Sequence, residues 1–477
     1  MPYEHGVKIS EVATALQSPV SSYASLPVII GAAPVWQVDG GTADLLNIPT
    51  LCTTLEEFQA AFGDSDDWEL YPLCEAADVF FTRYNVGPIV VINTLDPTTM
   101  VTAHAAVDAA LVAGVYTIAV DDAILSSLVV KSADGNTTYT LTTDYTVAYN
   151  TAMRLVVTRV ATGTIPAADT ALKYEFDSYL GTEMDSGDIE AGIDAVENVY
   201  SQTGQVPGQL LAPGWSQQSA IGAALVAEAA SINGVFKARA IVDVDSDTGE
   251  AETYTAAVTR KGTDSYTDEL MVVCWPMVTL SNVSYWMSLH YAAVRCALNA
   301  ANNDVPYASP SNQRMAIDGL ITESGTAVYL NNVQANVLNA GGIVTGLNWS
   351  RGWVLWGNES GAYPGSTDPI LRWNCVRDMF NWIGNTAILT YWQNVDQPGN
   401  PRLIDTVVTS FNQWLNGLTS QGYILGGRCQ FLASSNPTVN LIGGDFVFDI
   451  DPTPPVPAKS ITFRMTYNTE YLSTLFG

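Results

Sequence analysis

The sequence is poor in charged side chains, and few of these are basic. Asp, Glu, Lys and Arg together make up 14% of the 477 residues, against about 25% in a typical soluble domain. Lys and Arg number 19 and Asp and Glu number 48, which gives a formal net charge of −29. Nucleic acids and anionic lipid surfaces are held by clustered basic side chains. The sequence therefore predicts no nucleic-acid partner and no direct membrane partner.

The short motifs of common cofactor, metal and phosphate sites are also missing. The chain contains no G-x-x-x-x-G-K-[ST] and no G-x-G-x-x-G. The cysteines form no C-x-x-C pair, so we expect free and mostly buried thiols at Cys52, Cys74, Cys274, Cys296, Cys375 and Cys429. No apolar run approaches the ~18 residues that cross a bilayer, and no secretory signal is seen. We expect no cofactor, no metal site and synthesis in a cytoplasm.

The sequence does have ample material for a packed core. Hydrophobic residues make up 47% and aromatic residues 10% of the chain, which excludes global disorder. The length suggests about two to four domains. A chain with so few charges covers itself with small polar and apolar groups, and such a surface is easily buried against partners. Residues 276–477 are nearly neutral, with 12 acidic and 9 basic side chains. These features favour a subunit of an assembly.

The order of the predicted elements divides the chain into segments. Between about 96 and 180, short strand candidates alternate with turn signals, which indicates a small all-β domain inserted into a larger domain. Strands and helices alternate around it, which favours an α/β core with a mostly parallel sheet. The predicted segments are an N-terminal arm (1–25), the first part of the core (26–95), the inserted β domain (96–180), the second part of the core (181–375), an α+β C-terminal domain (376–458) and a C-terminal strand or arm (459–477).

Capping signals predict where several helices begin. Thr54, with Glu57 three residues later, has the spacing of a capping box for a helix over 55–62. Asn400 followed by Pro401 predicts the start of an amphipathic helix. We expect Gly422 to end that helix, and we expect further helices near 70–84, 250–260 and 284–302.

Both ends of the chain carry short alternating apolar stretches. At the N-terminus such a stretch is too short to bury a face alone, so it reads as an extended arm. Its apolar residues are Val7, Ile9 and Val12. In the C-terminal part, the Pro-rich link 452–457 separates one alternating stretch, 446–450, from a second one made of Ile461, Phe463, Met465 and Tyr467. A Pro-rich link is a semi-rigid spacer that cannot join a sheet ladder centrally. The final strand can therefore pair on another chain.

Two patterns resemble sites of chemistry, and we favour a structural interpretation of each. Asp243–Gly249 resembles the start of a calcium loop, but its glycine falls one place late and Tyr254 stands where a bidentate Glu is needed. We expect an acidic turn after a strand there. Asn348–Gly352 resembles a nucleophile elbow but lacks the first glycine. Its Ser350 would need one of the histidines as base, and these stand at His5, His104 and His290.

Two functional alternatives stay open from the residues alone. One is an α/β hydrolase-like enzyme, which predicts labelling of Ser350 by a serine-reactive probe. The other is a carbohydrate-binding surface protein, because the chain has 12 tryptophans. These include Trp349, Trp353, Trp356, Trp373 and Trp382. We favour core and interface aromatics over sugar stacking, since these residues stand among Gly and apolar neighbours.

Several segments, taken in order, resemble the contractile tail sheath family of phages, R-type bacteriocins and related injection machines. They span nearly the whole chain: His5-Gly6-Val7, Glu11-Val12, Ile29-Ile30-Gly31-x-Ala33-Pro34, Phe58 to Gly63, Phe80-Phe81, Pro207 to Gly214, Pro306 to Asn312, Gly342 to Thr345, Trp356-Gly357-Asn358, Asp396-x-Pro398, Arg402 to Asp405 and the terminal strand pair.

The resemblance implies a structural subunit that polymerises helically around a tail tube and contracts to drive the tube through a cell envelope. It implies an α/β core of subtilisin-like topology without a catalytic triad, an outward inserted β domain and an α+β C-terminal domain near the tube. It also implies that the two arms reach neighbouring subunits, at positions matching Val7, Ile9, Val12, Ile461, Phe463, Met465 and Tyr467.

The implied partners are further copies of the chain, a tail tube protein, and baseplate and tail terminator proteins. The implied location is the tail of a virion or a bacteriocin particle, assembled in a host bacterial cytoplasm. No enzymatic activity and no cofactor are implied.

Overall fold

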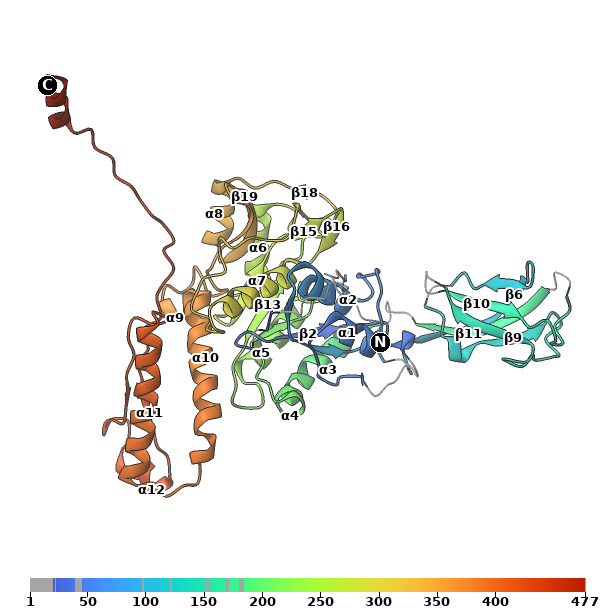
Figure 1. Cartoon of the computed structure of the whole chain (residues 1–477), viewed down its shortest axis with the longest axis horizontal. Coiled ribbons are helices and arrows are strands. Elements are labelled where there is room, and N and C mark those ends of the chain that lie inside the picture. The colour runs from blue at the N-terminus through green and yellow to red at the C-terminus, as the bar shows by residue number, and fades with distance from the viewer. Residues whose placement is uncertain are drawn as a thin grey trace, which may run out of the picture.

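The computed structural model of the chain describes residues 20–476 apart from 22, 39–44, 97, 121, 151–153, 168–170 and 180–183. Figure 1 shows a central body of helices around a sheet, a β domain that projects to one side, a pair of long helices on the other side, and a C-terminal arm that extends away from the rest. Among the described residues, no helix is both long enough and apolar enough to cross a membrane.

The central body is built on an eight-stranded sheet in the order β20-β19-β14-β13-β12-β2-β5-β3. The strands from β19 to β5 run parallel to their neighbours, and the two edge strands are antiparallel, so the predicted mostly parallel sheet is confirmed. Their bounds are β2 Pro27–Gly31, β3 Thr50–Cys52, β5 Ile89–Asn93, β12 Gln209–Leu211, β13 Arg239–Asp243, β14 Met271–Cys274, β19 Ile343–Trp349 and β20 Gly352–Trp356.

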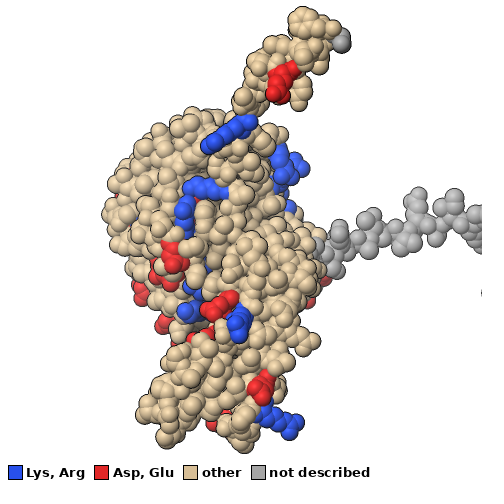
Figure 2. All heavy atoms as spheres, turned by 90° about the vertical axis from the view of Figure 1, so that its left-hand side faces the viewer, with Lys and Arg blue, Asp and Glu red and all other residues tan. Residues whose placement is uncertain are grey.

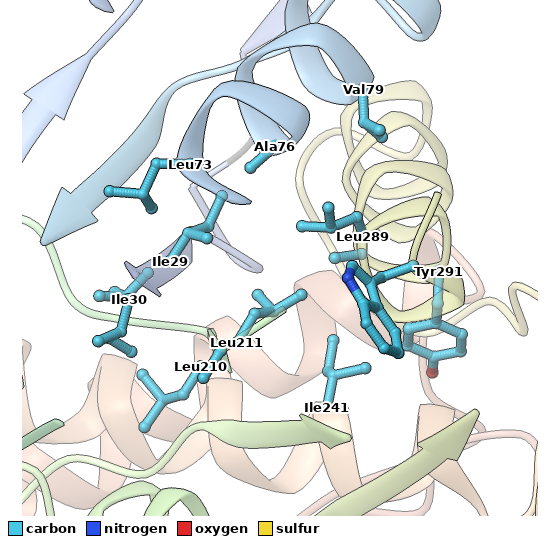
Figure 3. Close-up of a cluster of buried hydrophobic side chains, with 14 of the residues drawn as sticks. Ile29, Ile30, Leu73, Ala76, Val79, Leu210, Leu211, Ile241, Leu289 and Tyr291 are labelled. Carbon is cyan, nitrogen blue, oxygen red and sulfur yellow. The ribbon is translucent and has the colours of Figure 1, made fainter. Parts of the chain in front are cut away.

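Helices cover this sheet, and its central strands are buried on both faces. Every residue of β2, β5, β12, β13 and β14 is buried. Figure 3 shows side chains of β2, β12 and β13 meeting side chains of the helices α2 and α7. The helical elements of the body are η1 (Val35–Gln37), α1 (Leu55–Phe62), α2 (Pro72–Ala77), η3 (Asp78–Arg83), α3 (Ser186–Asp194), η6 (Ala195–Asn198), α4 (Val199–Thr203), α5 (Ser219–Ala230), α6 (Tyr254–Thr263), α7 (Met287–Ala301) and α8 (Asn332–Ala340).

Two small sheets complete the body. One pairs β1 (Val20–Ser21) with β4 (Val86–Gly87) in parallel. The other is four-stranded, in the order β16-β15-β17-β18, and all its pairs are antiparallel. Its strands are β15 Met277–Leu280, β16 Val283–Tyr285, β17 Gly319–Ile321 and β18 Ala327–Val328.

Residues 101–179 form the projecting β domain, which consists of two three-stranded antiparallel sheets. The strands are β6 Val101–Ala110, β7 Val115–Thr117, β8 Val129–Ser132, β9 Tyr145–Tyr149, β10 Leu155–Arg159 and β11 Ala171–Tyr179, with a short helix η4 at Leu125–Ser127. This domain has its own apolar core, which includes Val130, Leu155 and Leu172. The paired strands β6 and β11 join it to the body.

The C-terminal region begins with α9 (Pro369–Arg372) and the long helices α10 (Asn374–Tyr391) and α11 (Pro401–Ser420). Asn400 caps α11 by accepting a hydrogen bond from the backbone N–H of Leu403, as its position before Pro401 predicts. Between and after them lie η7 Trp392–Asn394, β21 Cys429–Gln430, α12 Thr438–Gly443, β22 Asp449–Ile450 and η8 Thr469–Phe476. Trp382 of α10 and Trp414 of α11 pack with ring centroids 5.4 Å apart.

The first half of α10 is fixed to the body by a buried ion cluster. Asp378 of α10 lies 3.2 Å from the guanidinium of Arg239 in β13 and 2.9 Å from that of Arg295 in α7. Arg239 also donates to the backbone carbonyls of Leu270 and Met271. A buried charge is tolerated only where it is paired and hydrogen-bonded. The cluster therefore ties α10 to the sheet and to α7.

Several predicted elements differ in extent from those observed. The helix predicted near 70–84 is α2 followed by the π-helix η3. The helix predicted near 250–260 begins only at Tyr254, because the Thr253 side chain caps it. In the capping box of α1, Thr54 accepts from the N–H of Glu57 as predicted, but the Glu57 carboxylate accepts from Thr53 instead of Thr54.

The predicted strand over 446–450 is also shorter than expected. Only Asp449–Ile450 pairs as β22, because the side-chain amide of Asn436 holds both backbone groups of Val447. A side chain that satisfies a backbone N–H and C=O removes them from the ladder.

Candidate assembly interface

The described part of the N-terminal region is firmly attached to the body. Val20 pairs with Val86 in the β1–β4 ladder. Beyond it, the backbone N–H groups of Tyr23 and Ala24 donate to the carboxylate of Asp304 at 2.9–3.1 Å. Residues 20, 21, 23 and 24 are therefore held against the body of their own copy. The predicted arm contacts of this end lie outside the described residues: Val7, Ile9 and Val12.

The C-terminal arm shows the opposite behaviour, because its apolar side chains face solvent. The exposed fractions are 72% for Ile461, 87% for Phe463, 95% for Met465 and 75% for Tyr467. Residues 460–468 are extended and pair with no strand among the described residues. Figures 1 and 2 show the arm standing away from the body. The four predicted contact positions are therefore in one segment, on alternating sites, and available to another chain.

The root of the arm is held by a buried carboxylate. Glu359, only 3% exposed, lies 3.0 Å from the ammonium of Lys459 and 3.4 Å from the guanidinium of Arg372. Arg372 stacks over the rings of Tyr363 and Trp373 at 4.3 and 4.2 Å. The position of Lys459 is thus set by contacts with the body, and the free part of the arm begins directly after it.

The loop that carries this anchor is itself bound to the body. Lys261 of α6 is buried and its ammonium donates to the carbonyls of Gly341, Gly361 and Tyr363 at 2.7–2.9 Å. Burial lowers the pKa of Lys261 to about 8, which is still above neutral pH. The side chain therefore stays protonated at neutral pH and can donate to all three carbonyls. A fixed loop gives the arm a defined starting direction.

The two-stranded sheet of the C-terminal region has an open edge. Asn412 of α11 holds both backbone groups of Cys429 in β21, accepting from its N–H at 2.9 Å and donating to its C=O at 2.8 Å. Cys429 is directly opposite Ile450 in β22. When two residues face each other in an antiparallel pair, the N–H and C=O groups of both residues point either toward the partner strand or away from it. The N–H and C=O of Ile450 therefore point to the outer edge of β22, where no described strand pairs.

An apolar cavity of about 760 Å³ lies beside this edge, between the far half of α10, α11 and the segment that leads into β22. Among the lining residues only Asp396 is charged. The apolar lining includes Ile388, Leu403, Val407, Phe446, Phe448 and Ile450. Figure 2 shows that charged side chains are sparse on the face that carries these helices. A strand added to β22 would therefore lie next to an apolar hollow.

Comparison with known proteins identifies the family. No family model matches the chain. The chain is 27% identical to the tail sheath protein of Burkholderia phage BcepMu over 493 aligned positions, which cover 100% of this chain and 99% of that protein. This chain is a tail sheath homologue. The family predicted from the sequence is thereby confirmed.

Solved structures share the fold of this tail sheath homologue. The helical sheath of the anti-feeding prophage in its contracted state is 15% identical, with a TM-score of 0.58 over 97% of this chain and 99% of that chain. The sheath complex of the extracellular contractile injection system PVC, also contracted, is 14% identical, with a TM-score of 0.56 over 99% of each chain. The predicted mixed α/β fold is therefore confirmed.

The hydrolase-like pattern in the sheath homologue is not assembled into a site. Ser350 is exposed in the turn between β19 and β20. His290 is buried in α7, its Nδ1 lies 3.0 Å from the Tyr84 hydroxyl, and burial lowers its pKa to about 3. His104 pairs with Ser178 inside the β domain at 2.7 Å. Within the described part of the chain, neither histidine is hydrogen-bonded to Ser350.

The acidic pattern after β13 belongs to an ion-paired turn. Asp245, Glu250 and Asp264 all contact the guanidinium of Arg260 in α6. Asp243 is buried and accepts from the backbone N–H of Ser288 at 3.0 Å. The predicted acidic turn after a strand is confirmed.

Of the tryptophans considered for a sugar surface, Trp349 is 63% exposed, whereas Trp353, Trp356, Trp373 and Trp382 are partly buried.

Sequence reasoning did not find three features of the candidate interface of the sheath homologue. These are the Glu359 anchor, the cavity beside β22, and the terminal helix η8. The first two join residues that are distant in sequence, so no local pattern could show them. The third had a local signal, because Tyr471, Leu472, Leu475 and Phe476 recur at helical spacing at the end of the chain.

Proposed function

We propose that this chain is the structural subunit of a contractile sheath. Copies of it polymerise helically around a tail tube, and the lattice contracts to drive the tube through a cell envelope. The observation that supports the proposal is the C-terminal arm, whose apolar side chains are exposed on a chain that is homologous over its full length to a tail sheath protein. The function has no catalytic residue, metal or cofactor.

The proposed partners follow from this role. The chain binds further copies of itself, a tail tube protein, and baseplate and tail terminator proteins. It resides in the tail of a virion or in a bacteriocin-like particle that is assembled in a bacterial cytoplasm. The nearly neutral character of residues 276–477 supports extensive contact between copies, because the core of an interface is depleted in charge.

We assign separate roles to the segments of the chain. The core (26–95 and 181–375) has a subtilisin-like topology without a triad, the β domain (96–180) faces outward, and the C-terminal domain (376–458) lies near the tube. The arms (1–25 and 459–477) connect copies through the residues that lie beyond their attachment points, 20–24 at one end and Lys459 at the other. The buried cluster around Asp378 supports treating core and C-terminal helices as one body that moves together.

The arms act by strand addition. An extended segment that pairs with a foreign sheet edge gains main-chain hydrogen bonds, each worth about 0.5–1.5 kcal/mol net, and inserts alternate side chains. In the C-terminal arm these side chains are Ile461, Phe463, Met465 and Tyr467, and the open edge of β22 is a suitable receptor. Ordering the arm costs about 1–2 kcal/mol per residue, so burial of its apolar side chains must supply much of the binding free energy.

Strand exchange explains how copies can rotate without separating. A paired strand is a tether fixed at both ends, and the body between its tethers turns as a rigid unit. In this proposal the extended sheath is the less favourable packing, and contraction releases free energy by burying more surface between copies.

Deletion of residues 460–477 tests the proposal. The variant keeps Lys459 and its ion pair, so it should have the circular dichroism and unfolding midpoint of the full chain while forming no tubes in negative-stain micrographs. A full-length control with Ile461, Phe463, Met465 and Tyr467 all replaced by Ser should also remain monomeric, which separates loss of side chains from loss of length. Tubes of normal abundance from the truncated chain would contradict the proposal.

A further inference from the structure

The arm does not end with its strand. It ends in the helix η8, whose apolar side chains have no cover in the described part of the chain. Exposed fractions are 73% for Tyr471, 76% for Leu475 and 89% for Phe476. In a 3₁₀-helix, residues three apart lie above one another, so Leu472 and Leu475 form one apolar face. The helix carries a single charge, at Glu470.

The cavity beside β22 has matching properties. Its volume of about 760 Å³ lies within the range of about 300–1,000 Å³ that is typical of pockets that enclose whole ligands, so it can hold several side chains. The walls come from α10, α11 and the residues around β22, and they are mostly apolar. Ile450 contributes both to the open edge and to the wall of the cavity.

We infer that η8 of one copy fills the cavity between α10 and α11 of a neighbouring copy. The inference rests on the proposed function, because it requires the preceding residues 461–467 to pair with β22 of that neighbour. The strand would place Tyr467 at the edge, and η8 follows it after a single residue. The arm then has two attachments: hydrogen bonds at the edge, and an apolar plug that enters the hollow beside it.

Two other segments compete with η8 of a neighbour for this cavity: η8 of the same copy and the N-terminal arm. The experiment distinguishes between them. Residues 460–468, fully extended at about 3.3 Å per residue, span about 30 Å. The 18-residue helix α10 is about 27 Å long, so the arm could also reach the cavity of its own copy. The N-terminal arm, which includes Ile9, is a second candidate for the same cavity.

A cysteine that already lines the cavity provides the first test. Cys429 is a free thiol in the wall, so Leu475→Cys in the full-length chain should form a disulfide with Cys429 of the next copy under mild oxidation of assembled sheaths. Burial raises the pKa of the Cys429 thiol, so the reaction is run at alkaline pH with an oxidation catalyst. The expected product is a ladder of covalent multimers, and Cys429→Ser in the same chain should abolish it.

The possible outcomes decide between occupants. A disulfide formed within single chains means that the arm folds onto its own cavity, which overturns the inference. Multimers from Ile9→Cys together with none from Leu475→Cys would assign the cavity to the N-terminal arm and overturn it as well. Phe476→Cys covers the case of an unsuitable side-chain direction at 475. Absence of multimers from both C-terminal positions, in sheaths that do assemble, rejects the plug.

A second measurement tests the energetic role of the plug. Leu472→Asp with Leu475→Asp should raise the concentration needed for sheath assembly by about tenfold or more, because each buried apolar side chain is worth at least that factor in association. Ser473→Asp with Thr474→Asp adds the same charge to η8 outside its apolar face. This control pair should change the concentration needed for assembly by less than about threefold. Equal effects of the two pairs would reject the inference.

Failure of the plug and failure of the proposed function give different results. If Phe463→Asp with Met465→Asp prevents assembly while the Leu472 and Leu475 variant assembles normally, only the plug is rejected. If the unaltered chain forms no tubes with or without a tail tube, the proposed function is rejected and the plug with it.

Discussion

The β domain and the C-terminal arm both project from the central body, but they differ in what covers their apolar side chains. In the β domain, Leu155, Val157 and Leu172 are completely buried by the domain itself. In the arm, Phe463 and Met465 are almost completely exposed. A segment that buries its own apolar residues is complete in one copy of the chain. A segment that leaves them in water is complete only when another molecule covers it.

The attachment of the two segments differs in the same way. The β domain is joined to the body through the paired strands β6 and β11, which share a long ladder. The arm is joined by one strand of backbone, with Lys459 as its last contact to the body. We therefore expect the β domain to move as a rigid unit and the arm to act as a tether.

The largest expected difference is between two Phe→Ala substitutions. Phe176 in the β domain is 2% exposed and stacks on His104 at 4.6 Å, so Phe176→Ala should lower the free energy of unfolding by about 3–5 kcal/mol. Phe463 in the arm is 87% exposed, and Phe463→Ala should leave the unfolding of the monomer unchanged while weakening assembly. Denaturant titration followed by tryptophan fluorescence and circular dichroism measures the first, and sedimentation measures the second. Comparable destabilisation of the monomer by both changes would remove the distinction.

The next effect concerns a buried carboxyl of the body, for which the arm has no counterpart. Burial raises the pKa of Asp243 from its ordinary value of 3.8 to about 7. Between these values the folded chain binds the proton and the unfolded chain has lost it, so stability falls as pH rises from about 4 to about 7, by up to about 1.4 kcal/mol per pH unit. Asp243→Asn should remove this slope while Asn keeps an acceptor for Ser288.

The measurement is the unfolding midpoint of the monomer in denaturant across that pH range. The slope for Asp243→Asn should be shallower by about one proton than that of the unaltered chain. Glu228 also has a raised pKa, but its causes are burial and the charges of Glu197 and Asp194, so its titration contributes to both curves and cancels in the difference. Identical slopes would show that Asp243 does not titrate in this range.

The smallest expected effect on folding comes from the anchor of the arm. Lys459→Gln removes the arm's side of this ion pair and leaves the pair of Glu359 with Arg372 in place. Because Lys459 is half exposed, the free energy of unfolding should change by less than about 1 kcal/mol. Assembly should slow, since the arm no longer leaves the body in a fixed direction. Lys237→Gln makes the same charge change at an exposed position of the body away from the anchor and should leave both quantities unaltered. Normal assembly kinetics for Lys459→Gln would mean that the starting direction of the arm has no role.

Local patterns in the sequence predicted the parts of the fold that depend on local physics. The run Pro27–Gly31 is apolar at every position, as a strand covered on both faces must be, and Asn400 before Pro401 marked the start of α11. The distributed resemblance identified the family. Alternation in Ile461, Phe463, Met465 and Tyr467 correctly indicated an extended segment, although pairing with another chain stays a prediction.

The remaining features depend on contacts between distant residues. Glu359 and Lys459 are 100 positions apart, and neither has a neighbour in sequence that marks it as an anchor. The strand predicted over 446–450 was too long because Asn436 holds the backbone of Val447, a tertiary contact. The cavity beside β22 exists only because α10, α11 and the residues around β22 meet in space.

Hydrogen–deuterium exchange on residues 460–476, in the monomer and in assembled sheaths, gives the most direct test of whether one copy binds the arm of another. In the monomer the amides of residues 460–468 should exchange at the rate of an unstructured peptide, since this part of the arm is extended and exposed. In assembled sheaths, strand pairing should protect the amides between 461 and 467 strongly, with protection lost in monomers released by dilution. Equally fast exchange in both states would show that the sheath forms without the arm.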